Sequence, residues 1–281
     1  MINPRVFESL RARAEQETSA RAAIDGLVEA LERSVAYAQG VLSRVHATPR
    51  ARYADLLLPA AEAAVADETA KIRQLAEVAS AHPYYKFNNR WTRHLQDAIA
   101  TVLLTAWLGG SVGGSSGGST DPGELGRLLT LEEVGEALGV PVDGPVDAAA
   151  AQTDVDVGAE DRFHVALDEY LSALTMLADE LGRLAMNAVT LGDGALAVRI
   201  SRFVKELHGG FQLLNLKNDF LRKRVDGVKY AVKRVEGVIY DLALRNLLPA
   251  EVGAESEDGE TKTVAAATAA EKATDSRMGE A

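Results

Sequence analysis

The sequence contains no cysteine, and aromatic residues make up only 5% of its 281 positions. The absence of cysteine excludes disulfide bonds, thiolate metal sites and cysteine nucleophiles. The longest apolar run, residues 98–108, is too short to span a bilayer and is typical of a buried helix segment. The first residues, MINPRVFESLRARAEQ, lack the apolar stretch of a signal peptide. We therefore expect a soluble protein of the cytoplasm or nucleus that has no membrane partner.

Negative charge is distributed unevenly along the chain. The net charge of −11 at pH 7 argues against non-specific adhesion to nucleic acid. Residues 251–281, however, contain eight acids against three bases and show no apolar periodicity. A segment of this composition buries too little apolar surface to fold. We therefore expect residues 250–281 to form a disordered acidic tail, and the basic residues of the remaining body to lie in clusters.

Helical periodicity covers most of the body. Apolar residues at helical spacing predict helices over roughly 6–45, 53–81, 84–108, 130–138 and 163–189. Pro59 is tolerated only in a first turn, so the regular part of the second helix should begin there. Thr130, with Glu133 three residues later, predicts a helix cap. Residues 109–128 are rich in glycine and serine and predict a flexible loop. With no strand-like alternation, the sequence predicts one all-α domain over residues 1–249.

The most regular pattern lies in residues 201–248. One apolar residue recurs every seven positions, and a second row, four residues after the first, is interrupted only by Asn218. Two such rows form one narrow stripe on a helix, either a core face or an interface. Because the pattern persists for several heptads, we expect a helix–helix seam that involves another subunit. The seven-residue row consists of Leu207, Leu214, Leu221, Val228, Val235 and Leu242.

Basic residues lie between these apolar rows, most densely at Arg222, Lys223 and Arg224. A basic helix face either binds a phosphate backbone or pairs with acids on a neighbouring helix. The spacing alone favours the second, structural interpretation.

A second basic cluster lies in residues 84–94, where cations alternate with aromatic residues and two asparagines. Cations that bind phosphates, beside rings that stack on bases, are what single-stranded nucleic acid requires. The alternative is a helix start whose rings pack inward and whose cations are solvated. The stretch contains Tyr84, Tyr85, Lys86, Phe87, Asn88, Asn89, Arg90, Trp91, Arg93 and His94.

Acidic residues offer a weaker candidate for chemistry. Asp168 and Glu169 precede Asp179 and Glu180 by eleven residues, about three helical turns, so the two pairs lie roughly on one face. Together with Asp97 from another helix, such carboxylates would suit Mg²⁺ and phosphodiester hydrolysis. Solvated or lysine-paired acids are the more frequent outcome of this pattern. The five histidines show no metal-ligand spacing.

Three long segments resemble the translin family. The stretch 210–245, GFQLLNLKNDFLRKRVDGVKYAVKRVEGVIYDLALR, resembles its C-terminal signature; YYKFNNRWTRHLQ (84–96) and VALDEYLSALTMLADELGRLAMNAVTLGD (165–193) are similar to other parts of the same family. The resemblance implies a bundle of long helices that assembles with itself into a hollow octamer and binds single-stranded RNA and DNA. It also implies a partner, translin-associated factor X. The mixed octamer with that partner is an endoribonuclease in small-RNA passenger-strand removal and transfer-RNA precursor processing.

The resemblance also assigns residues. It places the family's nucleic-acid motif at Lys86, Asn88 and Arg90, and raises the chance that the basic residues of 222–224 contribute. The candidate nucleic-acid-binding residues are thus Lys86, Asn88, Arg90, Trp91, Arg93, Arg222, Lys223 and Arg224.

The partner's four catalytic acids correspond to Asp97, Ala100, Met176 and Glu180, so this chain keeps two of the four. Because Mg²⁺ needs several oxygen ligands, we expect a translin-type subunit with no metal of its own, and Mg²⁺ only in the nuclease complex. Two alternatives remain. One is an intrinsic Mg²⁺-dependent endoribonuclease that uses Asp97 and Glu180, and the other is a purely structural helical oligomer.

Overall fold

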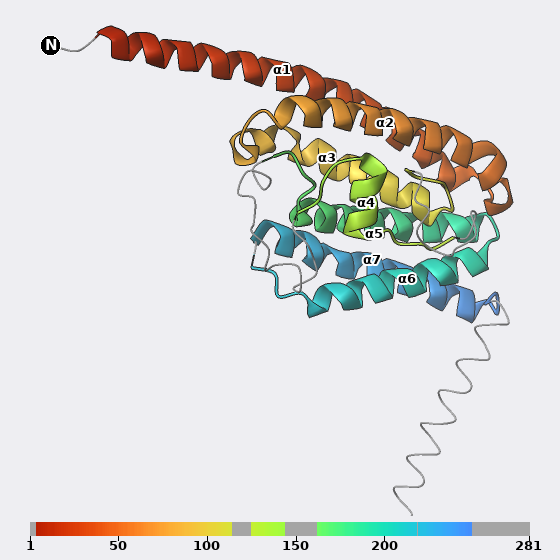
Figure 1. Cartoon of the computed structure of the whole chain (residues 1–281). Helices are drawn as coiled ribbons and strands as arrows, with labels where there is room; N and C mark the ends of the chain where they lie inside the picture. The colour runs from red at the N-terminus through yellow and green to blue at the C-terminus, as the bar shows by residue number, and fades with distance from the viewer. Residues whose placement is uncertain (1–3, 114–124, 144–161, 218, 249–281) are drawn as a thin grey trace, which may run out of the picture.

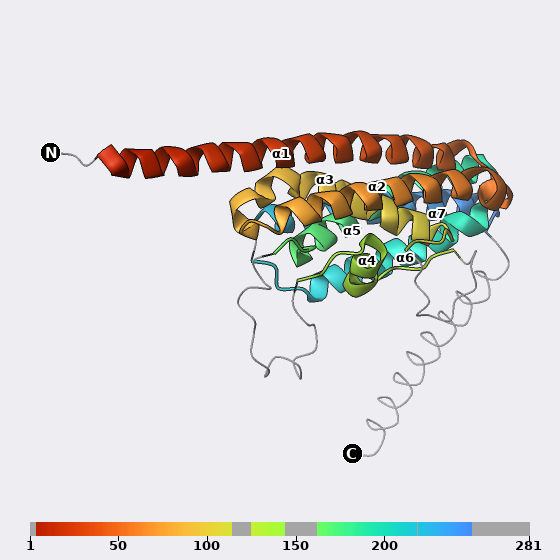
Figure 2. The same ribbon diagram turned by 45° about the horizontal axis from the view of Figure 1, so that its top comes forward.

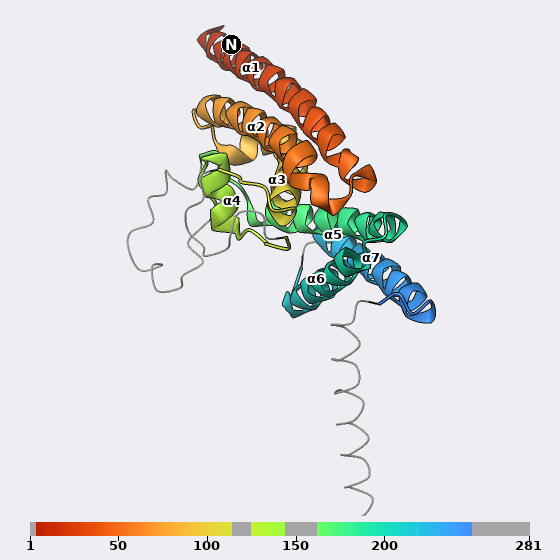
Figure 3. The same cartoon turned by 90° about the vertical axis from the view of Figure 1, so that its right-hand side faces the viewer.

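The computed structural model describes residues 4–113, 125–143, 162–217 and 219–248. The helix α5 lies at the centre, with α3 on one side and the pair α6 and α7 on the other, while α1 and α2 form the outermost layer (Figures 1 and 3). The α-helices of the described residues are α1 (Pro4–Leu42), α2 (Leu58–Ala79), α3 (Tyr84–Trp107), α4 (Leu131–Leu138), α5 (Leu167–Thr190), α6 (Gly194–Leu213) and α7 (Asp219–Leu244).

The predicted all-α class is confirmed. The described residues contain no named strand and only one isolated bridge, between Val142 and Val165. No helix among them is long and apolar enough to cross a membrane. Of the predicted Gly/Ser loop, residues 114–124 lie outside the described part of the chain, and so does the predicted tail, 250–281.

Local sequence signals set the helix ends as predicted. After a 3-10 turn (η1, Ser43–Ala47) and a single π-helical turn (η3, Tyr53–Leu57), the regular helix α2 begins at Leu58 with proline in its first turn. The Thr130 hydroxyl accepts from the backbone N–H of Glu133, and the Glu133 carboxylate accepts from that of Thr130, which completes a capping box for α4. Gly139 ends α4 in the left-handed region, at φ 69°.

The helix α1 is longer than the body that it covers. Its first half projects beyond the other helices, and burial of its apolar residues begins at Ile24 (Figure 2). Before that point, Val6, Phe7 and Leu10 are all more than half exposed. The second half packs mainly against α2 and α3.

The predicted single helix over 201–248 is wrong, because the helix breaks at residues 214–217. The chain reverses there, so α6 and α7 run antiparallel and both pack against α5 (Figure 1). The predicted seam is therefore mostly an internal core row, since neighbouring helices of the same subunit already cover its α7 members. The buried members are Leu221, Val228, Val235 and Leu242, whereas Leu207 is half-buried and Leu214 is exposed.

A carboxyl group is buried between α2 and α3. The Glu68 side chain is fully buried and its Oε2 accepts from the Thr101 hydroxyl at 2.6 Å, while its Oε1 has no hydrogen-bond partner among the described residues. Burial raises the pKa of Glu68 to about 8, against the smaller opposing effect of the Thr101 hydrogen bond. The folded subunit therefore holds Glu68 in its neutral form at neutral pH.

This burial predicts that Glu68→Gln stabilises the fold more at high pH than at low pH. Because the folded-state pKa of Glu68 lies above its unfolded value, the wild type loses stability as pH rises from about 4.5 through 8. Glutamine is neutral at every pH. The free energy of unfolding of the variant, relative to that of the wild type, should therefore rise by about 2–4 kcal/mol from pH 5 to pH 8.5. Urea unfolding at both pH values measures the difference. The control is Glu77→Gln on the exposed side of α2, and a gain that is flat with pH would contradict the prediction.

Candidate nucleic-acid interface

The basic–aromatic stretch forms the first three turns of α3, which begins directly after Pro83. One row of this helix faces inward: Phe87 is 2% exposed, Trp91 1% and Leu95 0%. The Trp91 ring lies 5.2 Å from Phe163 and 5.8 Å from Tyr84, centroid to centroid. Trp91 is therefore a core residue, and its predicted contact with nucleic acid is wrong.

The two principal predicted cations, Lys86 and Arg90, lie on the side of α3 that faces α1. Lys86 forms an ion pair with Glu17, and Arg90 Nη1 lies 3.5 Å from Asp25 Oδ1. The hydrogen bond from Lys86 lowers the pKa of Glu17. Both cations are more than a third exposed, so each is paired at its tip but still accessible to solvent.

A third side of α3 faces solvent. Tyr85 is 76% exposed, and Asn89 and Arg93 follow it at intervals of four residues, also exposed. Asn88, which was predicted to hydrogen-bond nucleic acid, is half-buried between this side and the core row. Tyr85 was not among the predicted site residues. The spacing of Phe87, Trp91 and Leu95 would have identified the inward row and left Tyr85 outside.

The predicted basic cluster of α7 is divided between two surroundings. Arg222 lines a cavity of about 390 Å³ between the end of α6 and the start of α7, and Lys223 is exposed. Arg224 instead faces α3, where its Nη1 donates to Gln96 Oε1 at 3.0 Å. The structure thus brings Arg224 close to the α3 candidates.

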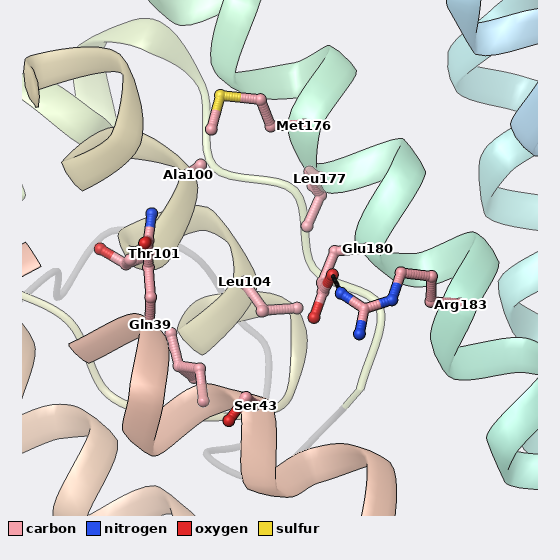
Figure 4. Close-up of a pocket in the computed structure, with 10 residues that line it drawn as sticks. Gln39, Ser43, Ala100, Thr101, Leu104, Met176, Leu177, Glu180 and Arg183 are labelled. Atoms are coloured by element: carbon pink, nitrogen blue, oxygen red, sulfur yellow. Dashed lines mark hydrogen bonds and ion pairs between the residues drawn. The ribbon is translucent and has the colours of Figure 1, made fainter. Parts of the chain in front are cut away.

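Three of the four positions that the resemblance assigns to the partner's catalytic acids converge, and only one of the three carries an acid. Ala100, Met176 and Glu180 line one cavity of about 290 Å³ between α1, α3 and α5 (Figure 4). Asp97, one turn earlier on α3, is not among its lining residues. Burial raises the pKa of Asp97, against the opposing charges of Arg93, His94 and Arg224.

The Glu180 carboxylate in this cavity already has partners. Its Oε1 lies 2.7 Å from His46 Nε2, and its Oε2 accepts from Arg183 at 2.8 Å. The Asn187 amide in turn lies 2.9 Å from His46 Nδ1. No sequence signal pairs His46 with Glu180, because they are 134 residues apart and meet only where η1 crosses α5.

The residues present do not fit Mg²⁺. Over the described ranges, no group of three or more histidine or acidic side chains is placed to hold a metal ion. The other predicted acids are also dispersed: Glu169 is buried and accepts from the Ala166 backbone N–H, and Asp179 lies 3.8 Å from Arg234. Burial raises the pKa of Glu169 to about 7.

The burial of Trp91 predicts a stability effect. Trp91→Ala should lower the free energy of unfolding by about 3–5 kcal/mol, because it removes a large ring from a packed core. Tyr85→Ala, six residues earlier, should change it by less than about 0.5 kcal/mol, because the ring is exposed. Urea unfolding of the two variants compares them. Equal effects would contradict the placement of Trp91 in the core and Tyr85 in solvent.

Comparison with known proteins agrees with this architecture. The translin of Gallus gallus is 40% identical over 167 residues, which cover 59% of this chain and 60% of that protein. The translin of Homo sapiens is 39% identical over 165 residues, 59% of each chain. The matched region thus spans about 60% of the length of these relatives.

Two solved structures share the fold at low sequence identity. The crystal structure of apo-NeC3PO has a TM-score of 0.55 at 16% identity and covers 82% of this chain and 96% of its own. The complex of AfC3PO with duplex RNA has a TM-score of 0.51 at 15% identity, with coverages of 86% and 98%. A family model described as "Translin family" matches residues 19–246. That match begins within α1 and ends just after α7, so it covers well over half of the chain. This chain therefore belongs to the translin family.

Proposed function

We propose that this chain is a translin-type subunit that binds single-stranded RNA and DNA within an oligomer. The observation that carries the proposal is the row of accessible cations on successive turns of α3, Lys86, Arg90 and Arg93, at the family's basic motif. Cations on one helix bind a phosphate backbone without reading its sequence. The net charge of −11 does not oppose this function, because these cations lie together.

The proposed oligomer is an octamer of this chain, or a mixed octamer with translin-associated factor X. Its contact surface is the outward face of α7 from Gly227 onward, in place of the buried seam. Tyr230, Tyr240 and Leu244 are each at least 59% exposed on that helix. Gly227 and Gly237 have open space where a Cβ would lie, so a second helix can approach the backbone closely.

In the mixed assembly this subunit holds the RNA and the partner cleaves it. The tasks proposed for that assembly are passenger-strand removal and transfer-RNA precursor processing, in the cytoplasm and nucleus. Mg²⁺ belongs to the partner in this proposal, since Ala100 and Met176 offer no carboxylate and Glu180 is held by His46 and Arg183. The same residues give an intrinsic nuclease little support. A purely structural oligomer is the alternative that a binding measurement decides.

The first prediction of this proposal concerns the α3 cations. The double variant Lys86→Ala/Arg90→Ala should bind single-stranded RNA more weakly. Its plot of log affinity against log salt should be shallower by about 1.4, because two phosphate contacts are lost. Fluorescence anisotropy over a salt series measures both quantities.

The matched control is Arg11→Ala/Lys71→Ala, which also removes one arginine and one lysine that each pair with an acid. Oligomer mass, with and without RNA, is recorded for every variant. Binding that is unchanged in the α3 double variant would contradict the proposed site. A wild type with normal oligomers but no affinity for RNA would favour the structural alternative.

A second prediction follows from the ion pairs between α1 and α3. Because Glu17 and Asp25 compete with phosphates for Lys86 and Arg90, Glu17→Gln/Asp25→Asn should bind single-stranded RNA about threefold to tenfold more tightly. The control Glu15→Gln/Asp67→Asn removes two acids that pair elsewhere and should change affinity less. Equal gains in both variants would mean that only net charge matters.

A further inference from the structure

The solvent-facing side of α3 carries a ring, an amide and a cation in order. Tyr85, Asn89 and Arg93 are separated by four residues each, so over about 12 Å they form a row that turns by about 80° around the helix, from the solvent side toward Lys86. Unlike Lys86 and Arg90, Arg93 has no α1 carboxylate against it among the described residues. The row therefore continues past the cations that α1 pairs and ends on an exposed arginine.

The open side continues onto α7. Arg224 bridges the two helices through its hydrogen bond to Gln96, and its guanidinium lies 4.7 Å above the Phe220 ring. Phe220 is 58% exposed although it is aromatic and lies in the first turn of its helix. Both α3 and α7 begin at the same end of the subunit (Figures 1 and 2). Arg93 lies three residues before Gln96, the partner of Arg224, so both arginines belong to the same part of α3.

Along this path lie, in order, the Tyr85 ring, the Asn89 amide, the Arg93 and Arg224 cations and the Phe220 ring. Exposed rings give bases a stacking platform, and arginines between them hold the phosphates of a flexible strand. A double helix cannot use such rings, because its bases are already stacked on each other. Asp97, four residues after Arg93 on α3, is half-buried.

We propose that single-stranded nucleic acid runs along a strip formed by Tyr85, Asn89, Arg93, Arg224 and Phe220, with bases stacked on the Tyr85 and Phe220 rings. This proposal rests on the proposed function and specifies its site. The ligand is an unpaired strand, and the residues that stack on its bases are Tyr85 and Phe220 rather than the buried Trp91. Lys86 and Arg90 then supply charge from the adjacent side of α3.

The test uses the full chain and a fluorescein-labelled, unstructured RNA of about 20 nucleotides. Tyr85→Ala and Phe220→Ala should each weaken binding about tenfold, since one stacked base is lost. Their salt slopes should match the wild type because no cation is removed, and Tyr85→Phe should retain affinity. The control Tyr37→Ala removes a tyrosine of α1 that is 66% exposed and should bind normally.

Tyr85→Trp provides a direct optical readout. Trp91 and Trp107 are 1% and 0% exposed, so a tryptophan at position 85 is the one among the described residues that meets solvent. Its emission should be quenched by single-stranded RNA and much less by the same RNA annealed to its complement. Oligomer mass must equal that of the wild type in every variant.

The outcomes separate the strip from the proposed function. If Lys86→Ala/Arg90→Ala weakens binding while either ring variant stays within twofold of the wild type, the strip is wrong and the proposed function stands. If the wild type does not bind RNA at all, both fall. Loss of affinity in both ring variants at an unchanged salt slope supports the strip.

Discussion

The subunit depends on the burial of α5, which is covered on several sides at once. Its neighbours are α3, α6, α7 and the turn η1, and its apolar residues Leu177, Leu181 and Leu184 are at most 1% exposed. A helix that is apolar around most of its circumference has to lie inside the molecule. Every candidate site of the chain is positioned by this helix, because α3 and α7 take their places by packing against it. The cavity around Glu180 also lies on it.

Charge pairing between helices decides which cations of α3 are available. Lys86 and Arg90 meet carboxylates from α1, whereas Arg93, seven residues after Lys86, is exposed and has no α1 carboxylate against it among the described residues. Exposed ion pairs are weak, so a polyanion can displace them. The arrangement gives α3 one surface whose cations are paired with α1 and another that presents an exposed ring and an exposed amide.

Most of the fold follows from periodicity and punctuation in the sequence. The ends of α2 and α4 were predictable because proline, the Thr130 cap and glycine act locally. The α6–α7 break was not, since an apolar row looks the same whether it meets its own subunit or a second copy. The inward position of Trp91 and the contact of His46 with Glu180 depend on how elements that are distant in sequence pack together. Such contacts have no local signal, and so the directions of the candidate side chains could not be predicted from the sequence.

The reversal between α6 and α7 gives the two halves of the heptad row independent registers. Residues 214–217 are mostly exposed, so a residue inserted there lengthens a connection without rotating either helix. One residue inserted inside α7 would instead rotate everything beyond it by about 100°. Val228 and Val235 would leave the core, and Gly227 and Arg234 would be turned toward α5 in their places. The chain therefore tolerates changes of length at its turn and forbids them one helical turn later, although the sequence pattern is the same on both sides.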